Sequence, residues 1–323
     1  MLAPVALTGA TGFIGRALVR RLQSEGLRVR ALVRPTSEAA ALPAGVERVV
    51  GSLHDADSLG RLVRGARAVV HCAGAVRGAS AGDFEPVNVE GVARLAHSTL
   101  AEPAAPAIVH LSSLAARHPE LSAYAASKRG GEQALLAAPA WTVLRPPAVY
   151  GPGDRELLPL LRWMARGIAP MVGSRRGRFS LLYVDDLAEA VARLVGLGGT
   201  GRVFDLDDGQ PSGYAMDDVV AAAERYRGRG ILRVTVPRRL LGGLARLNVL
   251  GARIRGRAPM LTPGKVREIF HQKWTCDNSA LAAATGWRPR IRLDEGLRRT
   301  LGGPAPGVRT FEGVGSCRRT EIS

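Results

Sequence analysis

Thr8-Gly9-Ala10-Thr11-Gly12-Phe13-Ile14-Gly15 is the stretch that decides the fold. An apolar run over Pro4–Leu7 precedes it and an amphipathic run over Phe13–Leu22 follows it, which predicts a strand, a glycine turn and a helix. Gly9 can adopt backbone angles that a residue with a Cβ atom avoids, and Gly12 lets the backbone come close to a bound pyrophosphate. The turn is therefore a candidate phosphate-binding loop.

The start of the following helix supplies the other contacts expected of such a loop. Gly15 allows close packing of helix on strand, and the unpaired N–H groups of the helix N-terminus point at the phosphates. The spacing is GxxGxxG rather than the GxGxxG of the dehydrogenase fingerprint, and the alternative is a tight turn that binds nothing. The residues expected to contact a dinucleotide are Gly9, Thr11, Gly12, Phe13, Ile14 and Gly15.

Strand-like and helix-like runs alternate through the first half of the chain. Strands are expected over residues 27–33, 46–50, 68–72, 108–111 and 142–144. Helices are expected over residues 13–24, 58–63, 87–100 and 124–137. This βαβ series predicts an α/β fold, a Rossmann-type doubly wound parallel sheet with helices on both faces, and ligands at the carboxyl ends of its strands.

The regular alternation loosens after Tyr150, where Pro and Gly become frequent. We therefore expect a dinucleotide-binding domain over residues 1–150 and a smaller, interleaved substrate lobe over residues 151–302. Within the lobe, Phe179–Val184 and Gly201–Asp205 are predicted to be strands that return toward the sheet. Residues 303–323 are rich in Gly, Pro and polar residues, which predicts a mobile tail.

The charge of the chain favours small anionic ligands over nucleic acid. Net charge is +17 over 323 residues, and 42 of the 45 basic residues are Arg, because the lysines are only Lys128, Lys265 and Lys273. The arginines are scattered through every segment without a nucleic-acid motif, which argues against nucleic-acid binding as the main function. Attraction of an anionic cofactor or substrate is the expected effect.

Cysteine usage and hydropathy indicate a cytoplasmic protein without a metal site. Cys72, Cys276 and Cys317 have neither metal-ligand nor CxxC spacing and fit a reducing compartment. A strand is predicted almost at the first residue, which leaves no room for a signal peptide. No apolar run reaches the roughly 18 residues of a membrane span.

Three strand ends add cofactor signals. Arg34 follows the second strand, where an acid would bind a ribose 2′-OH and an Arg suits a 2′-phosphate, so NADP(H) is favoured over NAD(H); the alternative is a solvent-exposed Arg. Ser52 and Leu53, after the third strand, are expected beside adenine. Small residues after the fourth strand would let the cofactor backbone pass, namely Cys72, Ala73 and Gly74. The preceding His71 is either a catalytic base or, as we favour, a packed histidine.

Tyr124 and Lys128 form the candidate catalytic pair. They stand four residues apart at the start of a predicted helix, so the phenol and the ammonium share one face. A tyrosine with its ordinary pKa is a poor acid–base group at neutral pH, and a nearby cation lowers that pKa. Ser112 and Ser113 end the fifth strand, which places a hydroxyl at the carboxyl edge of the sheet to bind a substrate oxygen.

Together these motifs resemble the extended short-chain dehydrogenase/reductase superfamily, the NAD(P)-dependent epimerase/dehydratase group. The resemblance runs from about Val5 to Leu301 and rests on several motifs in order: Thr8–Gly15, His71–Gly74, Asn88 in Val87–Gly91, Ser112-Ser113, Tyr124 with Lys128, Leu144–Pro152, Tyr183–Ala188 and Thr285–Pro289. It implies hydride transfer between nicotinamide and substrate. It also implies that members often dimerise, here through the helices before Leu100 and after Tyr124.

The resemblance also implies roles for individual residues. Tyr124 would be the acid/base, and Lys128 would modulate it and bind the ribose. Ser113 would orient the substrate oxygen, with Asn88 in the supporting network and Pro146 lining the nicotinamide end. One departure is Ser52, which stands where the family often has Asp, and this removes a side-chain carboxylate that would recognise adenine.

Within the superfamily, the sequence is most similar in pattern to dihydroflavonol-reductase-like and 3β-hydroxysteroid-dehydrogenase-like members. The signals are Ala31–Pro35, Val236–Leu241 and Pro259–Thr262. This branch implies oxidation or reduction of a bulky alcohol or ketone. The alternatives are a nucleotide-sugar epimerase or dehydratase that retains NAD, and a non-catalytic, cofactor-holding structural subunit. The intact Ser113, Tyr124 and Lys128 argue against the structural subunit.

The run Leu240–Ile254 can form a basic amphipathic helix. Leucines recur on one face, and around them stand Arg238, Arg239, Arg246, Arg253, Arg255 and Arg257. Such a helix can lie on an anionic membrane, but packing over the substrate lobe is the favoured interpretation. An apolar lid there suits a lipid-like substrate better than a sugar nucleotide.

Overall fold

A seven-stranded parallel sheet forms the centre of the molecule. The computed structural model describes residues 3–36, 42–174, 176–256 and 258–302. Across the sheet the order is β3-β2-β1-β4-β5-β6-β11, and every pairing is parallel. The strands are β1 (Val5–Thr8), β2 (Val29–Val33), β3 (Glu47–Val50), β4 (Ala68–His71), β5 (Ala107–Leu111), β6 (Trp141–Arg145) and β11 (Arg202–Asp205). The predicted Rossmann-type fold is confirmed.

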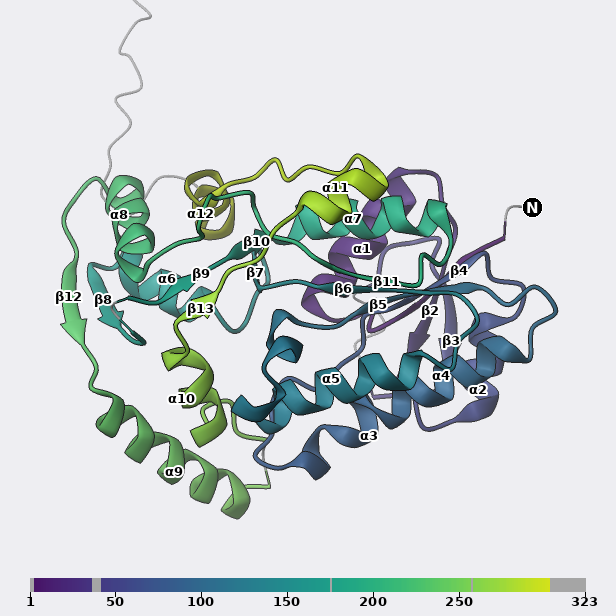
Figure 1. Ribbon diagram of the computed structural model, residues 1–323, viewed down its shortest axis with the longest axis horizontal. Helices are drawn as coiled ribbons and strands as arrows, with labels where there is room; N and C mark the ends of the chain where they lie inside the picture. Colours follow the sequence, from purple (N-terminus) through teal and green to yellow (C-terminus); the bar gives the residue numbers. More distant parts are fainter. Residues whose placement is uncertain (1–2, 37–41, 175, 257, 303–323) are drawn as a thin grey trace, which may run out of the picture.

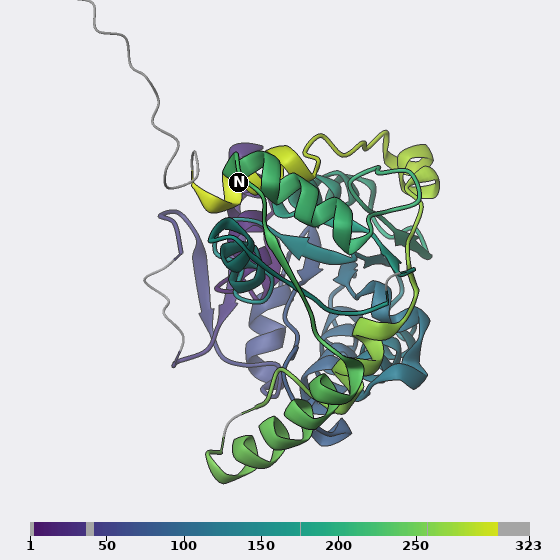
Figure 2. The ribbon, with the colours of Figure 1, turned by 90° about the vertical axis from the view of Figure 1, so that its left-hand side faces the viewer.

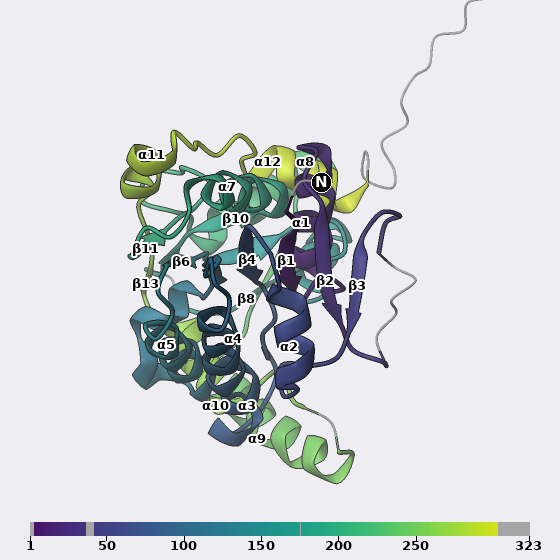
Figure 3. The ribbon, with the colours of Figure 1, turned by 90° about the vertical axis from the view of Figure 1, so that its right-hand side faces the viewer.

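Helices cover both faces of this sheet (Figures 1 and 3). One face carries α1 (Phe13–Ser24), α7 (Val184–Leu197) and α11 (Ser279–Thr285). The opposite face carries α2 (Ala56–Val63), α3 (Glu85–Asn88), α4 (Glu90–Leu100) and α5 (Ala123–Leu135). The strand order reverses between β1 and β4, which is where doubly wound sheets bind ligands at the carboxyl ends of their strands.

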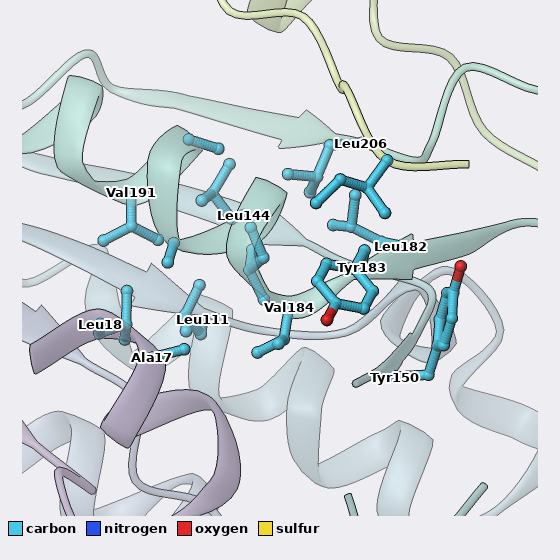
Figure 4. Close-up of a cluster of buried hydrophobic side chains, with 14 of the residues drawn as sticks. Ala17, Leu18, Leu111, Leu144, Tyr150, Leu182, Tyr183, Val184, Val191 and Leu206 are labelled. Carbon is cyan, nitrogen blue, oxygen red and sulfur yellow. The ribbon is translucent and has the colours of Figure 1, made fainter. Parts of the chain in front are cut away.

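Apolar side chains fill the layer on each face of the sheet. On the first face, Ala17 and Leu18 of α1 and Val191 of α7 face Leu111 and Leu144 of the strands (Figure 4). This cluster continues into the second half of the chain through buried residues that include Phe204, Trp287 and Leu297. Because one core draws on both sides of residue 150, the division of the chain there stays a prediction.

The remaining elements build the smaller lobe. Its helices are α6 (Leu158–Ala165), α8 (Met216–Arg227), α9 (Arg238–Ile254), α10 (Pro263–Phe270) and α12 (Leu293–Leu301). Its short strands pair in parallel as β7 (Ala148–Tyr150) with β10 (Leu181–Tyr183), β8 (Ile168–Met171) with β12 (Leu232–Thr235), and β9 (Arg178–Phe179) with β13 (Lys273–Trp274). Among the described residues, 3-10 turns occur at η2 (Ala81–Asp83), η3 (Leu114–Arg117) and η4 (Pro119–Leu121).

The two segments expected to return toward the sheet behave differently. Gly201–Asp205 contains β11, which pairs with β6 at the edge of the large sheet. Phe179–Val184 does not join that sheet: its residues divide between β9 and β10, which pair with β13 and β7. The reason is that β11 already occupies the free edge of β6. The expected tail over 303–323 lies outside the described residues.

No helix within the described ranges is both long and apolar enough to cross a membrane.

Candidate functional site

The glycine turn brings the ends of β1 and β4 into backbone contact. Gly9 has φ +75°, and a Cβ atom there would lie 2.6 Å from the backbone nitrogen of Ala73. A Cβ atom on Gly15 would lie 2.0 Å from the carbonyl oxygen of Gly9, so α1 can begin against the turn only without a side chain at that position. Both glycines are therefore required by the fold itself.

Gly12 differs, because the space beside it is open. It is the N-cap residue of α1, and a Cβ atom there would meet only the Gly9 carbonyl oxygen, at 3.3 Å. No side chain caps the helix and its first turn carries no acidic residue. Its free N–H groups and positive dipole end suit an anion, so the cradle fits the pyrophosphate of a dinucleotide. Beside it lie the other predicted contacts, Thr11, Phe13 and Ile14.

Two neighbouring strand ends carry the residues predicted for the adenosine half. Arg34 is exposed directly after β2, and Gly51 at the end of β3 donates its N–H to the carbonyl of Val33 over 3.0 Å. Ser52 Oγ accepts from the His54 N–H at 3.2 Å, and Leu53 is buried. The structure thus places Arg34 and Ser52 at adjacent strand ends, in line with the glycine turn.

Tyr124 lies in the first turn of α5, beside the end of β5. Burial raises the pKa of its phenol, while a hydrogen bond with Ser113 acts in the opposite direction. Ser113 itself caps η3, where its Oγ accepts from the Ala115 N–H at 3.2 Å. Pro146, after β6, accepts from the Leu114 N–H at 2.9 Å and so fixes the same turn. The geometry therefore brings the predicted serine and tyrosine hydroxyls together.

The adjacent Ser112 has a different task. Its Oγ donates to Glu132 Oε1 over 2.5 Å, and Glu132 also forms a two-pronged ion pair with Arg145. The buried carboxylate ties α5 to the ends of β5 and β6. Of the two serines, only Ser113 faces Tyr124.

Lys128 and Asn88 lie under the loop that follows β4. Lys128 Nζ donates to the Leu111 carbonyl over 2.7 Å, and burial lowers its pKa to about 8. Asn88 accepts from the Ala75 N–H at 2.8 Å, donates to the Ala75 carbonyl at 2.9 Å and donates to Ser127 Oγ at 2.9 Å. A Cβ atom on Gly74 would lie 3.4 Å from Asn88 Oδ1 and 3.7 Å from Lys128 Nζ, so this loop passes close to both side chains.

Of the two candidate side chains at the end of β4, His71 is buried and Cys72 is partly buried, and both are electrically neutral. Burial raises the pKa of the Cys72 thiol to about 12 and lowers the pKa of His71 to about 3. His71 Nδ1 lies 2.7 Å from Thr8 Oγ1, and its ring stacks on His110 with centroids 5.2 Å apart. This is the geometry of a packed histidine.

A second lysine, which the sequence reasoning missed, lies beside Tyr124. Lys265 of α10 places Nζ 6.0 Å from the centroid of the Tyr124 ring, and its charge acts to lower the pKa of the phenol. It also donates to Glu268 Oε2 over 2.9 Å. Burial acts to lower the pKa of Lys265, but the Glu268 carboxylate reverses this and leaves it above its ordinary value.

Glu268 connects this lysine to α5, the helix that carries Tyr124. Its buried carboxylate accepts a hydrogen bond from Ser122, the N-cap residue of α5. Lysine usage was the available signal: the chain has three lysines among 45 basic residues, of which Lys128 stands four residues after Tyr124 and Lys265 lies beside its ring. No cluster of His, Cys, Asp or Glu able to hold a metal ion occurs in the described part of the chain.

Comparison with known proteins agrees with the fold. Residues 5–206 match the model of the NAD dependent epimerase/dehydratase family. The chain is 36% identical to ceramide reductase of Caulobacter vibrioides over 303 residues, which cover 92% of this chain and 93% of the relative. It is 29% identical to 2-alkyl-3-oxoalkanoate reductase of Stenotrophomonas maltophilia, over 91% of this chain and 97% of the relative.

Solved structures share the architecture. MoeE5 in complex with UDP-glucuronic acid and NAD superposes with a TM-score of 0.70 at 21% identity, covering 93% of this chain and 97% of that one. At this identity the likeness concerns the fold alone. The family model matches residues 5–206, and the alignment with ceramide reductase, at 36% identity, extends over nearly the whole chain. This chain is therefore an enzyme that belongs to the NAD dependent epimerase/dehydratase family.

Proposed function

We propose that this enzyme interconverts a bulky, lipid-like ketone and the corresponding alcohol, with NADP(H) as its cofactor. The observation that carries the proposal is the neighbouring pair of Ser113 and Tyr124 at the carboxyl end of β5, with the Lys265 ammonium 6.0 Å from the Tyr124 ring centroid. This pair offers a substrate oxygen one hydroxyl to orient it and one phenol to exchange a proton with it.

A nicotinamide dinucleotide, when bound, would supply or accept the hydride. The residues of the chain would donate or accept the proton and position the substrate oxygen. In ketone reduction, Tyr124 Oη donates its proton to the carbonyl oxygen as the alcohol forms, and Ser113 Oγ holds that oxygen in place. In alcohol oxidation the same phenolate takes the hydroxyl proton back. Burial of the phenol opposes charge on it, so nearby cations are needed to stabilise the phenolate.

Two ammonium groups are available for this stabilisation. Lys265 acts on the phenol from the substrate lobe, where its charge offsets part of the rise in the Tyr124 pKa that burial causes. Lys128 stands one helical turn after Tyr124 and is held by the Leu111 carbonyl. Asn88 positions the loop after β4 by its two hydrogen bonds to the Ala75 backbone. Its third hydrogen bond, to Ser127, links this loop to α5, which carries Tyr124.

Both the relatives and the substrate lobe favour a lipid-like substrate. Two of the relatives that align over more than nine-tenths of this chain are named as reductases of a ceramide and of a 2-alkyl-3-oxoalkanoate. In this chain, α10 borders the site through Lys265, and α9 packs on α10 through an apolar contact of Leu241 and Ala245 with Val266. We carry the substrate class over from these names as a proposal for this enzyme.

The preference for NADP(H) rests on Arg34. This residue is exposed immediately after β2, where the adenosine ribose of a dinucleotide would lie, and it forms no ion pair with the other described residues. A guanidinium at this place can bind a 2′-phosphate through two parallel hydrogen bonds.

The test is consumption of reduced cofactor by the purified protein. A long-chain 3-oxo amide and a 2-alkyl-3-oxo acid are offered with NADPH or NADH, and the product alcohol is identified by mass spectrometry. We expect NADPH oxidation that requires the ketone. If the protein instead retains NAD through purification and interconverts UDP-sugars without net oxidation, it is an epimerase, and the reductase proposal is withdrawn.

A further inference from the structure

Helix α9 presents an uncovered apolar face at the periphery of the substrate lobe. Five large apolar side chains of this 17-residue helix are exposed, and Leu247 and Ile254 are exposed by 67% and 80%. All three ribbon views place α9 at the edge of the molecule, and Figure 2 shows it as the green helix at the lower margin. The exposed set is Leu240, Leu244, Leu247, Leu250 and Ile254.

These side chains lie on one side of the helix. With 3.6 residues per turn, all five fall within about a third of the circumference. A different side is already in use, because Leu241, Ala245 and Ala252 are buried and the first two pack with Val266 of α10. The helix is therefore held to the protein by one face and leaves a second apolar face open.

The charges that flank the open face indicate what covers it. Arg239 and Arg246 lie along one margin and Arg255 along the other, and all three are exposed. Residues 238–254 contain no Asp or Glu. Two copies of this chain meeting through α9 would set arginine against arginine without a compensating carboxylate. An anionic lipid surface, in contrast, offers apolar chains to the leucines and phosphates to the arginines.

We propose that α9 docks the enzyme on an anionic phospholipid bilayer, with its exposed leucines in the boundary between headgroups and acyl chains. The helix lies in the plane of that surface, since α9 is not among helices able to span a membrane in the described ranges. The docking helix packs on α10, which also carries Lys265 beside Tyr124. In the docked enzyme, α10 therefore links the membrane-bound helix α9 directly to the proposed catalytic site.

Vesicle binding tests the proposal without substrate or cofactor, so the result is independent of the proposed reaction. The intact protein is mixed with vesicles of phosphatidylcholine alone or of phosphatidylcholine with phosphatidylglycerol, and bound protein is measured by co-sedimentation. We expect binding to the anionic vesicles, weakened by added salt, and roughly 100-fold weaker binding by the triple variant Leu247→Gln/Leu250→Gln/Ile254→Gln.

A matched control separates docking from general surface hydrophobicity. Leu100→Gln/Leu136→Gln/Leu197→Gln replaces three leucines that are exposed by 51–58% on other helix ends, and it should bind like the unaltered protein. The proposal is overturned if the unaltered protein does not bind anionic vesicles, or if both triple variants bind equally well. It is also overturned if the α9 variant changes a dimer to a monomer in sedimentation velocity, because a second copy would then cover this face.

Discussion

The ammonium of Lys265 lies 6.0 Å from the ring centroid of Tyr124, although the two residues are 141 positions apart in the chain. The contact is held by Glu268, which binds both Lys265 and the N-cap Ser122 of the catalytic helix. The proposed acid–base residue Tyr124 is thus tuned by a charge on α10, which is far from it in the sequence. This arrangement leads to the first two predictions.

Tyr124→Phe should lower turnover by about 10²–10⁴-fold, the span expected when a positioned acid–base group is lost. Cofactor affinity should change little, because the phenol lies at the substrate end of the site. Steady-state rates and calorimetric cofactor titration measure the two effects. Tyr226→Phe, on α8, is the matched control and should retain full activity. Full activity in the Tyr124 variant would remove this residue from the mechanism.

Lys265→Met should raise the pKa of Tyr124, because it removes a cation that lowers it. In alcohol oxidation the phenolate is the active form, so the rise of kcat/KM with pH should move to higher pH. The third lysine provides the control: Lys273 is exposed, and Lys273→Met should leave the profile in place. An unchanged profile in the Lys265 variant would show that its charge does not reach the reacting phenol.

Gly12→Val should abolish dinucleotide binding while the protein stays folded. A Cβ atom at Gly12 meets only one backbone oxygen, at 3.3 Å, so the added side chain occupies the space of the pyrophosphate rather than the core. Gly15→Val is the contrasting variant and should fail to fold, because its Cβ would lie 2.0 Å from the Gly9 carbonyl oxygen. Circular dichroism and calorimetry distinguish the two. Unchanged binding in Gly12→Val would place the dinucleotide elsewhere.

Arg34→Ala should weaken NADP(H) binding about 10- to 150-fold and leave NAD(H) binding nearly unchanged. The estimate follows from about 1.5–3 kcal/mol for a hydrogen bond to a charged group. Dissociation constants for both cofactors are compared at one salt concentration, because the interaction is electrostatic. Arg67→Ala is the control, since Arg67 is exposed at the opposite end of β4. Equal affinity of the unaltered protein for NAD and NADP would contradict the assignment and favour the epimerase alternative.

Stability should fall as the pH drops below about 6.5. Burial lowers the pKa of His71 to about 3 and that of His110 well below its ordinary value, so the unfolded chain binds protons that the folded chain does not. Each such histidine removes about 1.4 kcal/mol of unfolding free energy per pH unit between its unfolded and folded pKa values. Urea unfolding from about pH 7 to about pH 5 measures this slope.

A histidine variant checks the origin of that slope. His110→Leu should reduce the slope by about one proton, because the unfolded variant no longer binds a proton at this position. The substitution breaks no side-chain hydrogen bond, since neither ring nitrogen of His110 has a partner among the described residues. His97→Gln, on the exposed side of α4, should leave the slope unchanged. A slope that is the same in all three proteins would assign the acid sensitivity to other groups.

The local signals along the chain predicted most of the sheet, because each strand and helix carries its own periodicity. The helix over Phe13–Ser24 was predicted with its observed bounds, and the Arg202–Asp205 strand within one residue. The expected helix over residues 87–100 instead divides at Val89 into α3 and α4. Periodicity does not report which short strands pair, so the pairing of β10 with β7 was missed.

The candidate site was predictable only where its residues are close in sequence or end neighbouring strands. Tyr124 and Lys128 share a helix, and Ser113 ends the strand beside it. The contact of Lys265 with Tyr124 depends on how the substrate lobe folds back over the sheet, and no short motif encodes that path. The residue roles themselves stay predictions until the variants are measured.

The close approach of α10 to the start of the catalytic helix has an evolutionary consequence. A Cβ atom on Gly264 would lie 2.9 Å from the Cβ atom of Ser122, so even a small insertion of bulk in α10 displaces the helix that carries Lys265. Under the proposed mechanism, a lineage that remodels α10 to accept a new substrate also moves the ammonium that acts on the Tyr124 phenol. Substrate range and pH optimum are then expected to change together.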